Sequence, residues 1–258
     1  MIGMDLRSRL VGGAFILPPL FLLLLWQYAS TCGFVSKALF PPPTDILSAF
    51  FELAVSGELS IHLQASLWRV LMGLGLGGIA GASAGLLTGR VKLIDHSLGP
   101  VLNLLRSFPP VALIPFIIVW FGIGDGAKVF SITFAVFFPV WVSTHSGASN
   151  IPPRYIQAAS TLSKSAVKVW LRVIMPASMP FIIAGARTGI GVAYIMVFVS
   201  ELAGASSGLG YLIAVSQLSY RIDRMIATLF VLGLLGAATD QAFTYSVRRL
   251  FPWAQMMG

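Results

Sequence analysis

The chain has 258 residues, of which 57% are hydrophobic and only 10% are charged. A soluble globular protein of this size needs far more polar surface, so the composition excludes that class and indicates a protein solvated by lipid. The net charge of +8 does not indicate nucleic-acid binding, because the basic residues gather in the segments between apolar stretches, as in membrane proteins.

Six apolar windows approach or reach the ~20 residues that a helix needs to cross a ~30 Å hydrocarbon layer. They are residues 11–29, 65–88, 101–121, 127–147, 178–202 and 224–246. They lack period-two alternation and are rich in Leu, Ala and Gly, which favours helices that pack through small residues. The sequence therefore predicts an all-α membrane protein with about six transmembrane helices in one domain, residues 1–258.

The first window is followed by Cys32, the single cysteine, which predicts neither a disulfide nor a thiolate metal site. The preceding ASTC fits a lipoprotein cleavage site poorly, so the first helix is expected to be retained. Prolines in FPPPTDI (40–46) then predict an extended segment. Residues 46–62 are amphipathic and predict a short helix on the outer surface.

The next two segments are rich in residues that break helices. GRVKLIDHSLGP (89–100) predicts a short basic cytoplasmic loop. In SFPPVALIP (107–115), the prolines remove backbone donors and predict a bend or break at membrane depth, which is tolerated only against protein or a watery cavity. Pro109 and Pro110 are therefore candidates for the wall of a pathway. FGIGDGAK (121–128) predicts a tight outer turn.

The distribution of basic residues predicts the orientation. With the N-terminus in the cytoplasm, ten of the seventeen Lys and Arg residues fall on the inner side, as the positive-inside rule requires. They are Arg7, Arg9, Arg90, Lys92, Arg154, Lys164, Lys168, Arg172, Arg248 and Arg249. Both termini are therefore predicted to be cytoplasmic.

A long inner segment at about 150–177 begins at the breaker NIPPR (150–154) and ends at MPASMP (175–180). Its middle is helical by composition, with Lys164, Lys168 and Arg172 spaced by four residues along one stripe. Such a cationic stripe suits the anionic headgroups of the inner leaflet. The small residues QAAS (157–160), just before a predicted bend at 161–163, would let another protein approach the backbone closely.

This segment resembles the cytoplasmic loop of membrane subunits of ATP-binding-cassette (ABC) importers, Glu-Ala-Ala, three residues, Gly, nine residues, Ile, one residue, Leu-Pro. The spacing matches without a gap, with Gln157 in place of the acid and Ser163 in place of the glycine. The other matched positions are Ala158, Ala159, Val173, Met175 and Pro176. If the family's glycine supplies a positive φ, Ser163 is strained by ~1 kcal/mol or more, or the turn is built differently.

The resemblance extends over roughly residues 40–246. FPPPTDI, the run at 106–129 and ELAGASSGLGYLI (201–213) are similar to the importer subfamily for nitrate, alkanesulfonates and taurine, with bicarbonate importers as relatives. It implies a type I ABC importer permease fold in the bacterial inner membrane, forming a pathway for one of these small anions.

The resemblance also implies partners. Two ATPase subunits would bind ATP and Mg²⁺, since this chain contains no G-x-x-x-x-G-K-[ST] phosphate loop and is expected to need no cofactor of its own. A second permease copy and an external solute-binding protein, docking near 46–62 and 204–212, would complete the assembly. A coupling helix would contact the ATPase through Gln157, Ala158, Ala159, Thr161, Leu162, Ser163 and Lys164, with Pro176 closing the motif.

Few polar residues fall inside the windows, and each is a functional candidate because buried charge is costly in a bilayer. Arg106 and Arg187 could attract an anion, and Glu201 is a third pathway candidate. Arg69 and Arg106 lie near span ends, where extension to the headgroups is the alternative. Glu201 and Arg187 are roughly 21 Å apart along one helix and cannot pair within it.

Three other function classes stay open from the residues alone. An ion-coupled secondary transporter would use acids at midplane, and only Glu201 and Asp240 are available. A membrane-embedded enzyme lacks a metal-spaced cluster or a nucleophile with its base. A scaffold without transport activity fits the composition but leaves the spacing of the loop motif unexplained.

Overall fold

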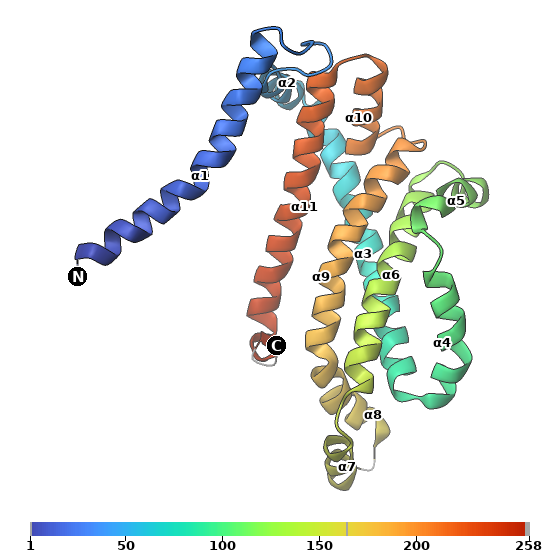
Figure 1. Cartoon of the computed structure of the whole chain (residues 1–258). Coiled ribbons are helices and arrows are strands. Elements are labelled where there is room, and N and C mark those ends of the chain that lie inside the picture. Colours follow the sequence, from blue (N-terminus) through green and yellow to red (C-terminus); the bar gives the residue numbers. More distant parts are fainter. Residues whose placement is uncertain (1, 164, 256–258) are drawn as a thin grey trace. The chain divides into compact units, whose positions relative to one another are not determined.

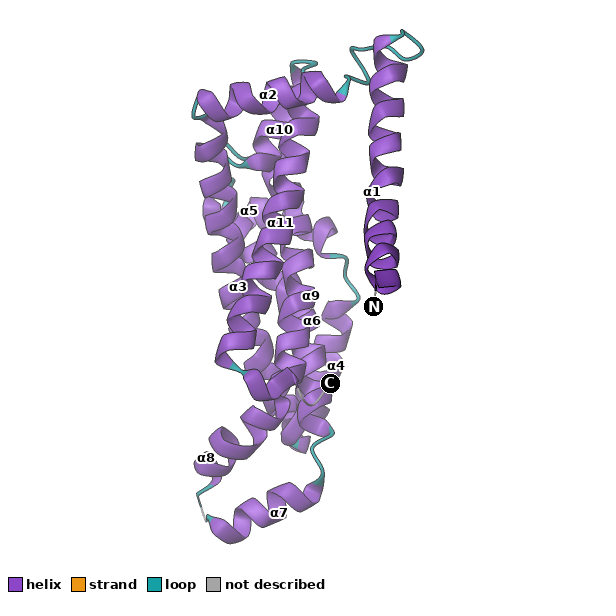
Figure 2. Ribbon diagram, turned by 90° about the vertical axis from the view of Figure 1, so that its left-hand side faces the viewer, coloured by secondary structure: helices purple, strands orange, loops and turns teal. Residues whose placement is uncertain are grey.

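The computed structural model describes residues 2–163 and 165–255, and every regular element in them is helical (Figure 2). The first half contains α1 (Ile2–Thr31), α2 (Pro43–Val55), α3 (Glu58–Arg90), α4 (Lys92–Arg106), the 3₁₀ turn η1 (Pro110–Leu113), α5 (Ile114–Phe121) and α6 (Asp125–Ser149). The second half contains α7 (Pro153–Leu162), α8 (Ala166–Val169), the π turn η2 (Trp170–Ile174), α9 (Met175–Leu202), α10 (Leu209–Leu218), α11 (Ile222–Leu250) and η3 (Pro252–Gln255).

Four of the described helical segments are long and apolar enough to cross a membrane: Glu58–Arg90, Asp125–Ser149, Ala166–Leu202 and Ile222–Leu250. They contain four of the six predicted windows. The window 101–121 forms a fifth span only as a pair of helices, Lys92–Arg106 and Pro110–Phe121, bent by 85°. The window 11–29 lies within α1. The structure does not describe the side chains of its first residues, 11–16, so the sixth span stays a prediction.

Three of the predicted boundaries are wrong. The outer helix expected at 46–62 ends at Val55, because Gly57 adopts a φ of +77° and turns the chain into α3. The loop expected at 89–100 is mostly the first half of α4, which accommodates Pro100 in its interior. The MPASMP segment does not end the inner loop but forms the first turns of α9.

The chain divides into two compact units, Met1–Ser60 with Leu212–Val231, and Ile61–Tyr211 with Leu232–Gly258. The first unit has a small core of Ile46, Ala49 and Ala227. Arg221 donates to Glu52 and Asp223, and Arg224 donates to Glu58. The pKa of Arg221 is raised, chiefly by its bond to Asp223, so this guanidinium stays charged at any physiological pH.

The second unit is built on α3, α6 and α9, which lie side by side (Figure 1). Five glycines of α3 at four-residue intervals face α6: Gly73, Gly77, Gly81, Gly85 and Gly89. A Cβ at Gly81 would fall 2.6 Å from the Phe137 carbonyl oxygen, so the two backbones lie in direct contact. On the other side of α6, Gly185 of α9 packs against Val140 in the same way. The expectation that glycines pack the helices is thus confirmed.

The glycine contact predicts a position-specific effect on stability. Gly81→Val is expected to lower the free energy of unfolding by about 1–3 kcal/mol or more, because α3 must move away from α6. Gly78→Val is the matched control, since a Cβ at Gly78 meets no atom within 4 Å. Thermal unfolding in detergent measures the difference. Equal melting temperatures for the two variants would contradict this account of the packing.

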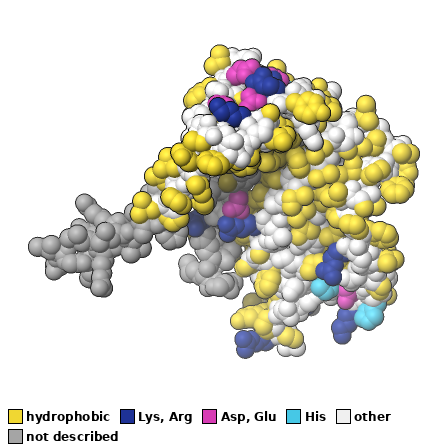
Figure 3. Space-filling view, turned by 45° about the horizontal axis from the view of Figure 1, so that its top comes forward, with side chains coloured by type: hydrophobic (Ala, Val, Ile, Leu, Met, Phe, Trp, Pro, Cys, Tyr) yellow, Lys and Arg dark blue, Asp and Glu magenta, His cyan; other side chains and the backbone are white. Residues whose placement is uncertain are grey.

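The surface agrees with solvation by lipid. On the face shown in Figure 3, hydrophobic side chains predominate and charged side chains occur in a few small groups. Large apolar side chains with more than half of their surface exposed occur along α11 and α5, for example Leu234 at 68% and Val119 at 81%. Water would disfavour this much exposed apolar surface, whereas lipid tails accept it.

Candidate functional site

The α7 helix projects beyond the ends of α6 and α9 (Figures 1 and 2). Pro152 and Pro153 break the chain after α6, and Pro153 begins α7, where its missing N–H is not needed. The predicted coupling residues Gln157, Ala158, Ala159, Thr161 and Leu162 all lie on this helix. The breaker predicted at 150–154 is therefore confirmed, and it places the small residues on an exposed helix.

One face of α7 is directed outward. Ile156, Ala159 and Ser163 are half-buried and mark the side toward the rest of the second unit. With 100° per residue, Arg154, Gln157, Ala158 and Thr161 lie on the opposite side, and all four are exposed. The exposed stripe thus contains three of the residues that the loop motif predicted.

The helix predicted through the middle of this segment is interrupted, whereas the predicted four-residue spacing of Lys168 and Arg172 lies on one continuous helical segment after the break. Ser163 has extended backbone angles, φ −152° and ψ 123°, and ends α7. A new helix starts after Ser165, whose hydroxyl accepts a hydrogen bond from the Lys168 N–H. Lys168 and Arg172 are therefore on a different helix from Gln157, and Lys164 lies outside the described residues. Because Ser163 needs no positive φ, it carries no left-handed strain, and the turn differs from the glycine turn considered above.

Two hollows flank the α7 helix. One, of about 540 Å³, is lined by residues that include Asn150, Pro152, Pro176 and Trp253. The other, of about 410 Å³, lies against Ala158, Ala159 and Ser163. The residues Tyr155, Arg172 and Val173 line both. The α7 helix thus contacts α8 and η2 and has open space on two sides.

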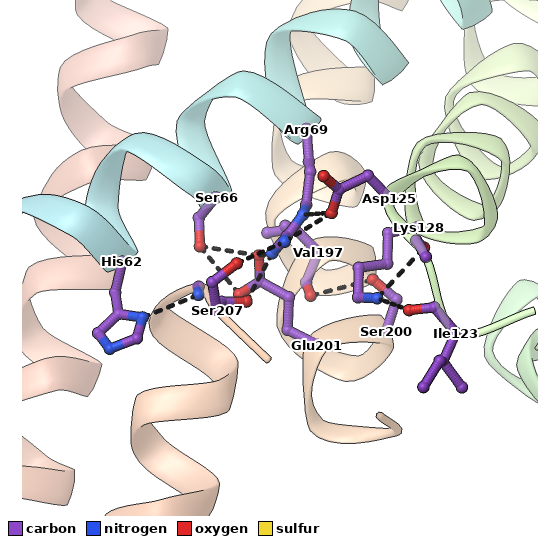
Figure 4. Close-up of polar contacts among 12 residues, drawn as sticks. His62, Ser66, Arg69, Ile123, Asp125, Lys128, Val197, Ser200, Glu201 and Ser207 are labelled. Atoms are coloured by element: carbon purple, nitrogen blue, oxygen red, sulfur yellow. Dashed lines mark hydrogen bonds and ion pairs between the residues drawn. The ribbon is translucent and has the colours of Figure 1, made fainter. Parts of the chain in front are cut away.

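A buried ionic network connects α3, α6 and α9 at the end that is far from α7 (Figure 4). Arg69 of α3 donates from Nη1 to Glu201 of α9 at 2.7 Å and from Nε to Asp125 of α6 at 2.8 Å. Arg69 is 3% exposed and Glu201 is 1% exposed. The expectation that Arg69 extends to the headgroups is therefore wrong, because these carboxylates hold it inside the unit.

The loop after α9 closes over this network. Arg69 also donates to the Ser207 carbonyl and hydroxyl oxygens. The Glu201 carboxylate accepts from the Ser66 hydroxyl and from the Gly210 N–H. A Cβ at Gly208, which has a φ of +116°, would overlap the Glu201 carboxyl group, so only glycine fits there. Every oxygen of Glu201 is thus occupied by a donor from within the unit.

Lys128 extends the network along α6. It is 4% exposed, and its Nζ donates to the carbonyl oxygens of Ile123 and Gly124. It thereby binds the turn between α5 and α6 rather than a carboxylate. In the described part of the chain, no group of three or more His, Cys, Asp or Glu residues is arranged to hold a metal ion.

The comparison with known proteins identifies the family. Residues 73–252 match the family described as binding-protein-dependent transport system inner membrane component. The chain belongs to this family. SsuC of Bacillus subtilis (strain 168), a permease named for aliphatic sulfonates transport, is 33% identical over 92% of this permease and 86% of its own length. The taurine transport system permease TauC of Escherichia coli (strain K12) is 30% identical over 90% of this permease and 86% of its own length.

Solved structures confirm the predicted permease fold of an ABC importer. The inward-facing MetNI methionine ABC transporter aligns with a TM-score of 0.60 at 21% identity, over 72% of this permease and 93% of that chain. A crystal structure of an amino acid ABC transporter aligns with a TM-score of 0.61 at 18% identity, over 78% and 98%. The permease is therefore a multi-pass membrane subunit of an ABC transporter, and the reading as an ion-coupled transporter is not favoured.

The predicted pathway residues of the permease have different settings. Pro109 and Pro110 lie at the bend of 85°, which confirms the predicted break, and Arg106 is exposed at the end of α4. Both carboxylate oxygens of Glu201 accept hydrogen bonds from within the unit, which is typical of a residue that stabilises the fold. Arg187 is 59% exposed and paired with Asp240 of α11. A role in the pathway stays a prediction for all five residues.

Several residues of the network were not identified from the sequence, namely Ser66, Asp125, Ser207 and Gly208. One signal was present: opposite charges inside apolar spans, at Arg69 and Glu201, are expected to pair, since neither is stable alone in a bilayer. The partners are more than a hundred residues apart, and no local pattern gives their register.

Proposed function

We propose that this chain forms the transmembrane pathway of an importer for small sulfonates, driven by ATP that separate ATPase subunits bind with Mg²⁺ and hydrolyse. The observation that carries the proposal is the exposed α7 helix, with small residues on its outward face, in a chain of this family. The relatives named for aliphatic sulfonates and taurine support the substrate class. Nitrate and bicarbonate are the alternative anions.

In this proposal α7 is the coupling helix. Gln157, Ala158 and Thr161 face outward, so a cleft in an ATPase can receive the helix and contact its backbone closely. Gln157 lacks the charge of the family's acid but can donate and accept hydrogen bonds there. The short connections of α7 to α6 and through α8 to α9 carry its displacement into the span helices.

The remaining assembly follows from the family and the surface. Two ATPase subunits and a second copy of this permease complete the transporter, since a symmetric pair is the commonest closed arrangement. Both termini lie in the cytoplasm, as the basic residues near α7 and at the end of α11 support.

The external binding protein docks on the outer surface of the permease, with α2 of the first unit as one candidate contact and, separately, the loop at 203–208 of the second unit as another. The turn between α10 and α11 supports a docking role. Tyr220 there is 83% exposed, so its ring is accessible to a partner.

Reconstitution tests the proposal. The permease is assembled in liposomes with its ATPase and binding protein, and uptake of radiolabelled taurine or an alkanesulfonate is measured. We expect uptake only with ATP on the ATPase side and with the binding protein outside. Uptake driven by a proton or sodium gradient without the ATPase would contradict the mechanism. ATP-driven uptake of nitrate or bicarbonate, but of no sulfonate, would contradict the substrate class.

A further inference from the structure

The ion pair between Arg187 and Asp240 lies deep within two spans. Arg187 is near the middle of α9, roughly 18 Å from Met175 at 1.5 Å per residue. Asp240 is in the second half of α11, roughly 15 Å from Leu250. Neither side chain is long enough to reach a headgroup easily from this depth. The pair is therefore a charged site inside the membrane rather than at its surface.

The geometry of the pair leaves part of the guanidinium unused. Arg187 donates from Nε to Asp240 Oδ1 at 2.9 Å and from Nη2 to Oδ2 at 3.0 Å. Asp240 thus takes two of the five guanidinium N–H groups and fixes the plane of the group. The other three, including both on Nη1, have no acceptor among the residues that the structure describes. Together with the 59% exposure of the side chain, this gives an oriented donor edge that faces out of the unit.

Around Arg187, the exposed face of α9 has small side chains. Ala184, Thr188 and Gly191 are exposed on the same side of the helix, and a Cβ at Gly191 would meet no atom within 4 Å. On α11, the residues exposed near Asp240 are also mostly small, namely Ala237, Ala238 and Ala242, and large exposed side chains such as Leu234 of α11 and Ile195 of α9 lie further along the helices. An exposed charge at membrane depth is stable only against protein or water. The small side chains leave space beside it for water and a solute.

We propose that Arg187, oriented by Asp240, is a binding site within the membrane for the oxyanion group of the transported solute, such as a sulfonate. This inference rests on the proposed function and adds the residue that contacts the solute. The free N–H groups match sulfonate oxygens, which accept from a planar fork. Asp240 partly neutralises the guanidinium, so the anion binds weakly enough to leave again, which passage requires.

The first test compares a neutral pair with the native one. Arg187→Gln and the double variant Arg187→Gln/Asp240→Asn are reconstituted with ATPase and binding protein, at equal amounts of assembled complex. Both are expected to lose about tenfold to a hundredfold in the initial rate of sulfonate uptake, the effect of losing a charge-assisted contact. The double variant can still form a hydrogen bond between α9 and α11 and has no uncompensated charge. If it transports at the native rate, the pair only links two helices and the inference is wrong.

A second test does not depend on transport. Thr188→Cys is placed in a Cys32→Ser background and labelled with sulfonatoethyl methanethiosulfonate, an anion, or trimethylammonioethyl methanethiosulfonate, a cation. We expect both reagents to react, with a ratio of anionic to cationic rates that falls several-fold when the neutral pair is introduced. No reaction with either reagent would mean that lipid or protein covers this face, and an unchanged ratio would mean that Arg187 attracts no anion. Either result overturns the site.

These outcomes separate the two proposals. If the native transporter imports sulfonates and the Arg187 variants do so at the same rate, only the inference about Arg187 fails. If the native transporter imports no sulfonate while the labelling ratio still depends on Arg187, the anion site stands and the proposed substrate fails.

Discussion

Ala158→Arg is expected to abolish ATP-driven uptake while leaving membrane insertion intact. Ala158 is exposed on α7 and borders the hollow of about 410 Å³, so a larger side chain there has space and need not displace a neighbouring helix. Arg is also nearly as good a helix former as Ala, so α7 should keep its structure. Its bulk and charge would instead prevent close docking of a partner, at about 2–4 kcal/mol or roughly thirtyfold to a thousandfold in affinity.

The control is the same substitution on the other side of the same helix. Ser160 is exposed but lies about 200° around α7 from Ala158. Ser160→Arg is expected to keep most of the uptake. Co-purification of the ATPase with each variant measures docking, and uptake in liposomes measures coupling. Native uptake by Ala158→Arg, or equal loss in both variants, would remove the assignment of α7 as the coupling helix.

Glu201→Gln is expected to be among the most destabilising single substitutions in the chain. The carboxylate accepts from Arg69, Ser66 and the Gly210 N–H. A glutamine amide must direct its NH₂ group at one of these donors, and it leaves the buried guanidinium paired only with the more exposed Asp125. Breaking a buried ion pair from one side costs about 3–5 kcal/mol.

An exposed pair in the same chain provides the comparison. Glu58 accepts from Arg224 at 3.2 Å, and the two side chains are 36% and 21% exposed. Glu58→Gln is expected to change the free energy of unfolding by less than about 1 kcal/mol. Thermal or denaturant unfolding of the purified permease in detergent measures both variants. Similar effects at the two positions would show that the buried network does not stabilise the fold as its geometry suggests.

The breaks in the chain could largely be predicted from its prolines and glycines. Pro109 and Pro110 predict the interruption of the third window, and Pro152 and Pro153 predict the start of α7. The errors arose where such residues act differently in context. Pro100 suggested a loop but lies within α4, and Gly57 ends the outer helix earlier than its amphipathic pattern indicates.

The contacts between distant charges could not be predicted in the same way. Arg69 and Glu201 are 132 residues apart, and Arg187 and Asp240 are 53 apart. Hydropathy identifies the spans that contain them but not the rotation of each helix about its axis. The two arginines look alike in the sequence, yet one is enclosed by carboxylates and the other presents free donors, because packing alone sets which side of a helix is covered.

The glycine contacts and the ionic network act on the same three helices. Close packing joins α3 to α6 and α6 to α9 along their length, and Arg69, Asp125 and Glu201 bind α3, α6 and α9 together at the end far from α7. Because these contacts recur along the three helices, the helices can change little in position relative to one another. Under the proposed function, a displacement of the coupling helix α7 should therefore tilt α3, α6 and α9 as one rigid body, without any need for the helices to slide past one another.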